Sequence, residues 1–236
     1  MFRVLSFLVL VSAVALHGQI QSITTTASYA VGLSKRLEVH SASAVGGGVE
    51  VTIGLSGRYS IGLQAGYASY SIDQTDQLNK WNWNFWNDRY YPKIQSDMRA
   101  DPNLSAQIGS VQTMDEIPVM LAVHYHAPAG GGVEIVPGAG AGFSFFSRKL
   151  YADETWTKQF PHAQYTLTYN LRNFAPQKKG NALVLAVGCD ATYRIGSDVN
   201  IIAGAHYRRY MSGTSGFEEF PLASGCIINL GLNFLY

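Results

Sequence analysis

The sequence has little charge, few cysteines and no long apolar run beyond its first residues. Only 14% of its 236 residues are charged, whereas an ordinary soluble domain carries about 25%. The 17 Lys and Arg are scattered and the net charge is +1, which excludes the basic stripe of a nucleic-acid-binding protein. Two cysteines exclude a disulfide-dense scaffold. No later segment has the roughly 18 unbroken apolar residues of a membrane-spanning helix. With 24 Gly and 14 Tyr, the composition favours a β-protein in an apolar environment.

The first residues predict an export signal. A short basic start precedes a largely apolar run, Val4–Leu16, whose length fits the core of a secretory signal peptide and is too short to span a bilayer. We expect residues 1–18 to be the signal peptide and residues 19–236 to be the exported barrel domain. The mature chain then starts at Gln19, with cleavage after Ala15 as the alternative.

Apolar residues recur at every second position along most of the remaining chain, which is the pattern of strands with two unlike faces. Seven such segments are 45–55, 59–67, 117–125, 133–145, 183–193, 201–207 and 226–236. A weaker eighth strand is expected over Ile23–Leu33.

Short and long connections alternate between these strands. The short ones are 56–58, 127–132 and 196–198, and the long ones are 34–43, 73–113, 148–181 and 211–224. Outer-membrane barrels show this alternation because their turns face the periplasm and their loops face outside. The sequence therefore predicts an all-β, eight-stranded antiparallel up-and-down transmembrane β-barrel of the OmpA/OmpX kind, in the outer membrane of a Gram-negative bacterium.

The apolar positions of this alternation, called the apolar parity, are expected to face lipid. The positions between them, the opposite parity, are rich in Gly and Ala, as a narrow lumen requires. The polar residues expected in the lumen are Glu50, Glu116, Glu134, Asp190, Arg194, His206 and Arg208. We expect Glu134 and Arg194 to approach within pairing range. Exposed apolar side chains are expected at Leu63, Val119, Leu185, Ala203 and Leu230.

Aromatic residues on the apolar parity lie near the strand ends, as two membrane-interface girdles would. One girdle is Tyr59, Tyr125, Tyr193 and Tyr236, and the other is Tyr67, Phe143, Phe145 and Tyr207. A secreted lipocalin-like barrel, with its apolar face around a ligand, is the alternative.

Two short motifs resemble the PorT-like outer-membrane β-barrel family of Bacteroidota-type bacteria. They are Asp115-Glu116-Ile117-Pro118-Val119-Met120-Leu121 and the Gly-rich segment Pro137-Gly138-Ala139-Gly140-Ala141-Gly142-Phe143. The final Asn229-Leu230-Gly231-Leu232-Asn233-Phe234 also fits, and the resemblance covers about residues 22–236. It implies an eight-stranded barrel in the outer membrane and brings no catalytic residues. The last residue is Tyr236, where Phe is commoner in the family.

The histidines and cysteines give little sign of chemistry. His124 and His126 share a strand face about 6–7 Å apart, but zinc needs a third or fourth ligand, so we expect no metal and no cofactor. Some small outer-membrane barrels modify lipids with a His and a Ser near the outer rim. His206 and Ser144 lie near that level but point into the lumen, so we predict no enzyme, with a lipid-modifying enzyme as the alternative.

All four tryptophans fall in two long loops. Trp81, Trp83 and Trp86 lie in one loop and Trp156 in the other. These residues are either a binding platform for a glycan, a peptide or an envelope protein, or a packed core of the loops. The run Lys80–Tyr91 is expected to be extended in part, with its aromatics packed on Trp156 and Phe160.

The expected function is a structural or binding role carried by the long outer loops. An eight-stranded lumen is filled by side chains, which disfavours a diffusion pore. The expected partners are outer-membrane lipid and an envelope protein or glycan bound by the loops, with no nucleic acid. Cys189 and Cys226 lie on strands separated by a third, so no disulfide is expected.

Overall fold

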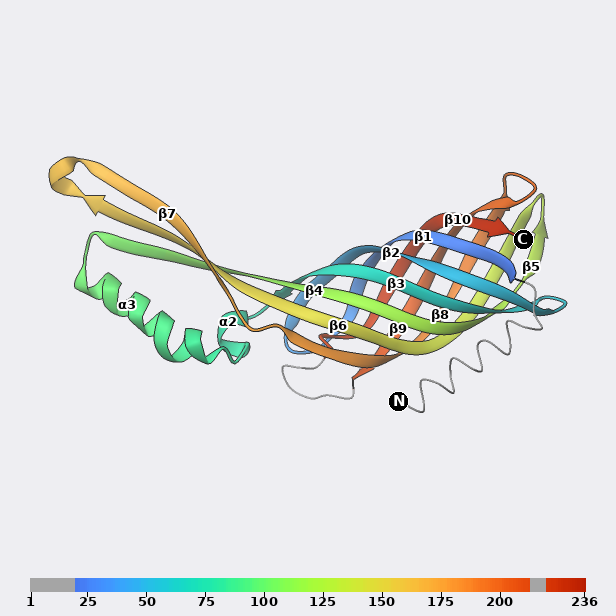
Figure 1. Ribbon diagram of the computed structural model, residues 1–236, viewed down its shortest axis with the longest axis horizontal. Coiled ribbons are helices and arrows are strands. Elements are labelled where there is room, and N and C mark those ends of the chain that lie inside the picture. The colour runs from blue at the N-terminus through green and yellow to red at the C-terminus, as the bar shows by residue number, and fades with distance from the viewer. Residues whose placement is uncertain (1–19, 213–219) are drawn as a thin grey trace.

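The computed structural model describes residues 20–212 and 220–236 (Figure 1). The expected signal peptide, the start at Gln19 and residues 213–219 of the last long connection lie outside these ranges. The strands are β1 (Ile20–Lys35), β2 (Val39–Ser56), β3 (Tyr59–Gln74), β4 (Leu104–Tyr125), β5 (Ala127–Gly130), β6 (Val133–Phe160), β7 (Tyr165–Phe174), β8 (Lys178–Arg194), β9 (Val199–Ser212) and β10 (Leu222–Leu235). The helices are α2 (Gln77–Lys80), a π-helix (Phe85–Tyr90), α3 (Tyr91–Ala100) and a 3-10 turn (Pro161–Ala163).

Eight antiparallel strands close into a barrel. They follow the order β1-β2-β3-β4-β6-β8-β9-β10, and β10 pairs with β1 to complete the circle. The ring confirms the predicted fold class and the weak eighth strand, which is β1. Closure leaves none of these eight strands with a free edge inside the barrel.

The two ends of the barrel differ. At one end, the turn end, short connections join β2 to β3, β4 to β6 and β8 to β9, and Ser22 pairs with Leu235. Gly57 and Gly130–Gly132 adopt positive φ there, as tight hairpins require. The opposite end carries the β1–β2 connection and the three longest connections, β3 to β4, β6 to β8 and β9 to β10, and is called the extension end below.

The long loop predicted over 34–43 is wrong. β1 and β2 run on to Lys35 and Val39, and a turn of only three residues joins them. Leu37 and Glu38 adopt left-handed φ of 55° and 56°, a conformation that neither residue type signals in a sequence. The inward parity of β2 at this end is occupied by Ala42 and Ala44, so the polar–apolar contrast that would mark a strand is absent.

Of the other predicted long loops, 148–181 is largely β-structure, whereas 73–113 combines helices with the first part of β4. β4 and β6 stay paired from His124–Gly138 in the barrel to Leu104–Lys158 far beyond it, and β7 pairs with the far part of β6. Residues 75–111 and 149–177 form this projecting unit, called the extension below. Figure 1 shows β4, β6 and β7 leaving the barrel together, with α3 beside β4 and β7 on the far side.

The outer surface of the barrel is apolar. All five side chains predicted to be exposed are so, from 36% for Leu63 to 62% for Leu230 among the four large ones. Tyr59, Tyr67, Phe143, Phe145 and Tyr193 are also exposed. This arrangement overturns the lipocalin-like alternative, because the apolar parity faces away from the lumen.

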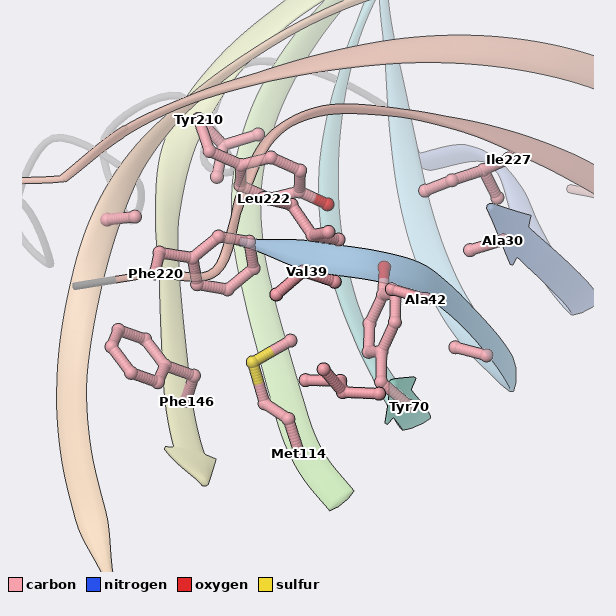
Figure 2. Packing of buried hydrophobic residues seen from close by; sticks show 14 of the residues in the cluster. Ala30, Val39, Ala42, Tyr70, Met114, Phe146, Tyr210, Phe220, Leu222 and Ile227 are labelled. Atoms are coloured by element: carbon pink, nitrogen blue, oxygen red, sulfur yellow. The ribbon is translucent and has the colours of Figure 1, made fainter. Parts of the chain in front are cut away.

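The extension-end half of the lumen is a packed apolar plug. Tyr210 stacks on Phe220 with ring centroids 4.3 Å apart, and Phe220 meets Phe146 edge-on at 5.2 Å. In the view of Figure 2, Met114 and Tyr70 lie below Tyr210 and Phe220. The plug side chains occupy the lumen-facing positions of their strands. They lie just beyond the strand ends that the sequence predicted, where the alternation was no longer followed. No helix within the described ranges is long and apolar enough to cross a membrane.

Candidate functional site

The turn-end half of the lumen is polar and holds two carboxylate–histidine pairs. Asp190 Oδ1 lies 2.9 Å from His206 Nε2. Glu50 Oε1 lies 2.7 Å from His124 Nε2. Each carboxylate therefore has a partner in the lumen, where an unpaired charge would be costly.

Glycines on the neighbouring strands make room for these pairs. A Cβ at Gly62 would lie 2.3 Å from Glu50 Oε1, and one at Gly204 would lie 1.7 Å from Asp190 Oδ1. The side chains therefore pass directly over backbone that carries no side chain. The Gly-rich lumen parity thus shapes the polar cluster as well as the narrow bore.

Ser60, His126 and Glu134 form a hydrogen-bonded relay at the turn end. Ser60 Oγ lies 2.8 Å from His126 Nε2, and His126 Nδ1 lies 3.2 Å from Glu134 Oε2. The order resembles that of a nucleophilic serine with its base. The Ser60 side chain has no exposed surface, and all three residues line the cavity at this end of the lumen.

The predicted pairing of Glu134 with Arg194 is wrong. His126 binds Glu134, and Arg194 is exposed where β8 leaves the barrel. The structure, which describes both residues, shows no ion pair between them. β8 extends past the last paired residues of β6, Val133–Tyr193, so the arginine clears the lumen.

The other predicted lumen residues lie inside the barrel. Glu116 is fully buried and accepts a hydrogen bond of 2.6 Å from Ser144 Oγ, and Arg208 is buried next to the plug. Within residues 20–212 and 220–236, no group of three or more His, Cys, Asp or Glu is placed to hold a metal ion. Cys189 and Cys226 are both free thiols.

The four tryptophans meet in the core of the extension. Trp81, Trp83, Trp86 and Trp156 are between 1% and 6% exposed, and they pack with Ile94 and Leu150. Their rings are therefore interior groups and do not form a binding platform. The packing with Trp156 agrees with expectation, whereas Phe160 lies outside this cluster and stacks on Tyr165.

The extended strand predicted for part of Lys80–Tyr91 is wrong, because residues 81–82 form a turn and residues 84–91 are helical. Trp83 stacks on Trp86 at 5.4 Å, and Trp86 meets Tyr90 at 5.5 Å. These spacings of three and four residues are neighbours on a helix. The aromatic residues of this run fit both the two-residue period of a strand and the three-to-four-residue period of a helix. Burial of the rings against β6 selects the helical form.

Glu154 is a buried carboxylate that sequence reasoning missed. It is 1% exposed and accepts hydrogen bonds from Trp156 Nε1 at 2.7 Å, Asn173 Nδ2 at 2.6 Å and Tyr90 Oη at 3.2 Å. The donors come from β6, β7 and the π-helix. The carboxylate therefore ties the helical segment to the sheet of the extension.

Trp81 anchors the extension to the barrel. Its Nε1 donates to the Pro176 carbonyl at 3.0 Å. The guanidinium of Arg148 lies 5.1 Å and the amine of Lys178 5.4 Å from its ring centroid, which is within cation–π range. Both cations lie where β6 and β8 leave the barrel, so the junction is tied on two strands.

No family model and no curated protein matches the chain. Similar solved structures include a major outer membrane protein from Thermus thermophilus, at 14% identity and a TM-score of 0.47, covering 91% of this chain and 99% of that one. Neisserial surface protein A matches at 11% identity and 0.46, covering 93% and 99%. Ail, the attachment invasion locus protein of Yersinia pestis, matches at 8% and 0.39, covering 92% and 100%. These TM-scores are below 0.5, so the barrel fold rests on the strand pairing described above.

Proposed function

We propose that this protein is an integral outer-membrane β-barrel of a Gram-negative bacterium whose structural or binding role is carried by the extension. The observation that supports it is the exposed apolar surface around a closed barrel with a partly polar lumen. In water, such a surface is far larger than the apolar patches that soluble monomers tolerate. In a bilayer it faces lipid, and closure of the ring pairs the backbone of each spanning strand on both sides.

The orientation follows from the unequal connections. Short turns face the periplasm in outer-membrane barrels and long connections face outside. The turn end then lies in the periplasm, and the extension projects from the cell. This orientation gives the extension access to envelope proteins, glycans and surfaces outside the membrane.

The lumen supports a closed barrel and not a diffusion pore. The apolar plug fills its extension-end half, and the turn-end half holds a cavity of about 80 Å³ among the carboxylate–histidine pairs. His206 and Ser144 are both engaged inside the lumen, with Asp190 and Glu116 respectively. This engagement favours a non-enzymatic role over lipid modification.

A place in the PorT-like family is also proposed. Its two motifs lie on adjacent strands, where Val119 of β4 pairs with Phe143 of β6 and Leu121 pairs with Ala141. The two segments therefore make one paired stretch of the barrel wall. The proposal concerns the family alone and assigns no secretion role.

The test is fractionation of the expressed full chain followed by gel migration before and after heating in detergent. We expect the protein in the outer-membrane fraction after a urea wash, with migration that changes on heating because the barrel stays closed until heated. Reconstituted in a planar bilayer, it should show no stable conductance. Recovery in the soluble periplasmic fraction, or steady conductance, would contradict the proposal.

A further inference from the structure

The outer edge of the extension is an unprotected β-strand. β7 pairs with β6 on one side, and no strand in the described ranges pairs with its other side. Every side chain of β7 except Asn173 is exposed. Natural edge strands are normally blocked by lysines, prolines, bulges or a covering element, and the stretch Tyr165–Leu171 has none of these.

An apolar row lies along this edge. Tyr165, Leu167, Tyr169 and Leu171 share the face of the sheet on which Trp156 lies and are between 39% and 55% exposed. The helical segment covers the same face over β4 and β6 and leaves this row exposed. The row therefore extends the apolar core of the extension as far as the unpaired edge of β7. The proposed orientation places this edge in water.

We propose that β7 pairs with β7 of a second copy of this protein, in antiparallel register, and that the two barrels lie in opposing membranes. This inference rests on the proposed function, because it needs the extension outside the membrane. The sequence of β7 is complementary to itself. With Thr168 opposite Thr168 of the second copy, Tyr165 faces Leu171 and Leu167 faces Tyr169, and the same pairs repeat by symmetry.

Charge and polarity agree with this register. The polar face then pairs Thr166 with Asn170 of the second copy, and Arg172 falls opposite Gln164 rather than another arginine. Arg172, the one charged residue of β7, is already bound by Asp153 of its own β6 at 2.6 and 3.2 Å. The pairing therefore brings no like charges together and matches residues of one kind across each face.

The direction of β7 selects opposing membranes. A two-fold axis that relates antiparallel strands is perpendicular to them, whereas two barrels in one membrane are related by an axis along the membrane normal. β6 runs unbroken from the barrel into the extension, and Figure 1 shows the extension projecting away from the barrel. Antiparallel pairing of β7 thus points the second barrel in the opposite direction, as at a contact between two cells.

The test uses vesicles carrying the full chain, with outward extensions verified by protease access to residues 75–111. Wild-type vesicles should cluster, as measured by energy transfer between two lipid-dye populations. One variant carries Leu167→Lys with Tyr169→Lys, and another carries Leu167→Glu with Tyr169→Glu. In the proposed register these positions face each other, so clustering of either variant alone should fall by about tenfold or more, since like charges oppose and many contacts act together.

Mixing the two variants should restore clustering, because each Lys then faces a Glu. The matched control places the same charge pairs at Ser96 and Ala100, two exposed residues of α3; these vesicles should cluster like wild type, and mixing should add nothing. If inserted, protease-accessible wild-type protein does not cluster vesicles, or the β7 variants cluster normally, the homotypic contact is wrong while the barrel stands. Failure of the chain to insert would instead contradict the proposed function.

Discussion

The barrel and the extension expose opposite kinds of surface. In the barrel, Leu185 and Leu230 point outward while Glu116 and Asp190 point into the lumen. In the extension, the tryptophans point inward and the exposed face of β6 carries polar residues such as Thr155. One continuous strand, β6, follows both rules and changes from one to the other near Arg148. The solvent around each region, lipid or water, explains the difference.

Among the strands of the two regions, β7 is the exception. It lies in the region that follows the rule for water, yet its apolar row is exposed as if it lay in lipid. Exposed apolar rows outside a membrane are typical of interaction surfaces. Substitutions in each region can test whether the barrel and the extension are as distinct as their surfaces indicate.

The largest expected effect is from Trp86→Ala, which empties the centre of the extension. Truncating a fully buried tryptophan costs about 3–5 kcal/mol, and we expect that loss to be confined to the extension. Limited proteolysis should cut within residues 77–100 much faster, while heat-modifiable migration stays normal. A variant that no longer assembles its barrel would show that the two regions are one folding unit.

Replacing an exposed leucine with arginine should have different costs in the barrel and in the extension. Leu185→Arg places a charge in lipid and should lower the free energy of unfolding by about 2–4 kcal/mol if the residue lies near the midplane. Leu167→Arg, the same change on β7, should cost less than about 0.5 kcal/mol, as at an ordinary water-exposed site. Denaturant titration in vesicles measures both, and equal costs would refute the difference in solvent.

Glu154→Ala should loosen the extension by about 1–3 kcal/mol, because it leaves buried donors on Trp156, Asn173 and Tyr90 without an acceptor. Glu154→Gln keeps one acceptor oxygen and should cost less. Proteolysis of the helical segment provides the measurement. Equal behaviour of the two variants would show that the carboxylate does not tie the helix to the sheet.

The smallest effect concerns acid. A hydrogen bond from Lys158 holds the pKa of Asp101 below its usual value, with the Asn103 backbone N–H adding to it. Because the pKa is lower in the folded state, ionised Asp101 stabilises the folded protein at pH values above its unfolded-state pKa of about 3.9. That stabilisation is lost as the pH falls through the folded-state pKa. Proteolysis after α3 should therefore rise below about pH 4, and Asp101→Asn should abolish this dependence. An unchanged pH profile would contradict it.

The sequence by itself determined the barrel. Period-two alternation determined which residues face outward, as at Leu63 and Val119. Every second residue of a strand lies on the same face of the sheet, so the apolar positions all face lipid. It also identified Glu50, Glu116, Asp190 and His206 as lumen residues. Their particular partners followed from strand register and from glycines opposite them, which a single strand does not reveal.

Only the tertiary structure decided the rest. The plug of Phe146 and Tyr210 lies on a parity predicted to be polar, and closing eight strands brings these rings together across the lumen. The helical form of Phe85–Tyr90 was selected by burial against β6, since the local pattern allowed both strand and helix. The exposure of β7 follows from the packing of the tryptophans over β6, which is a contact between segments far apart in the chain.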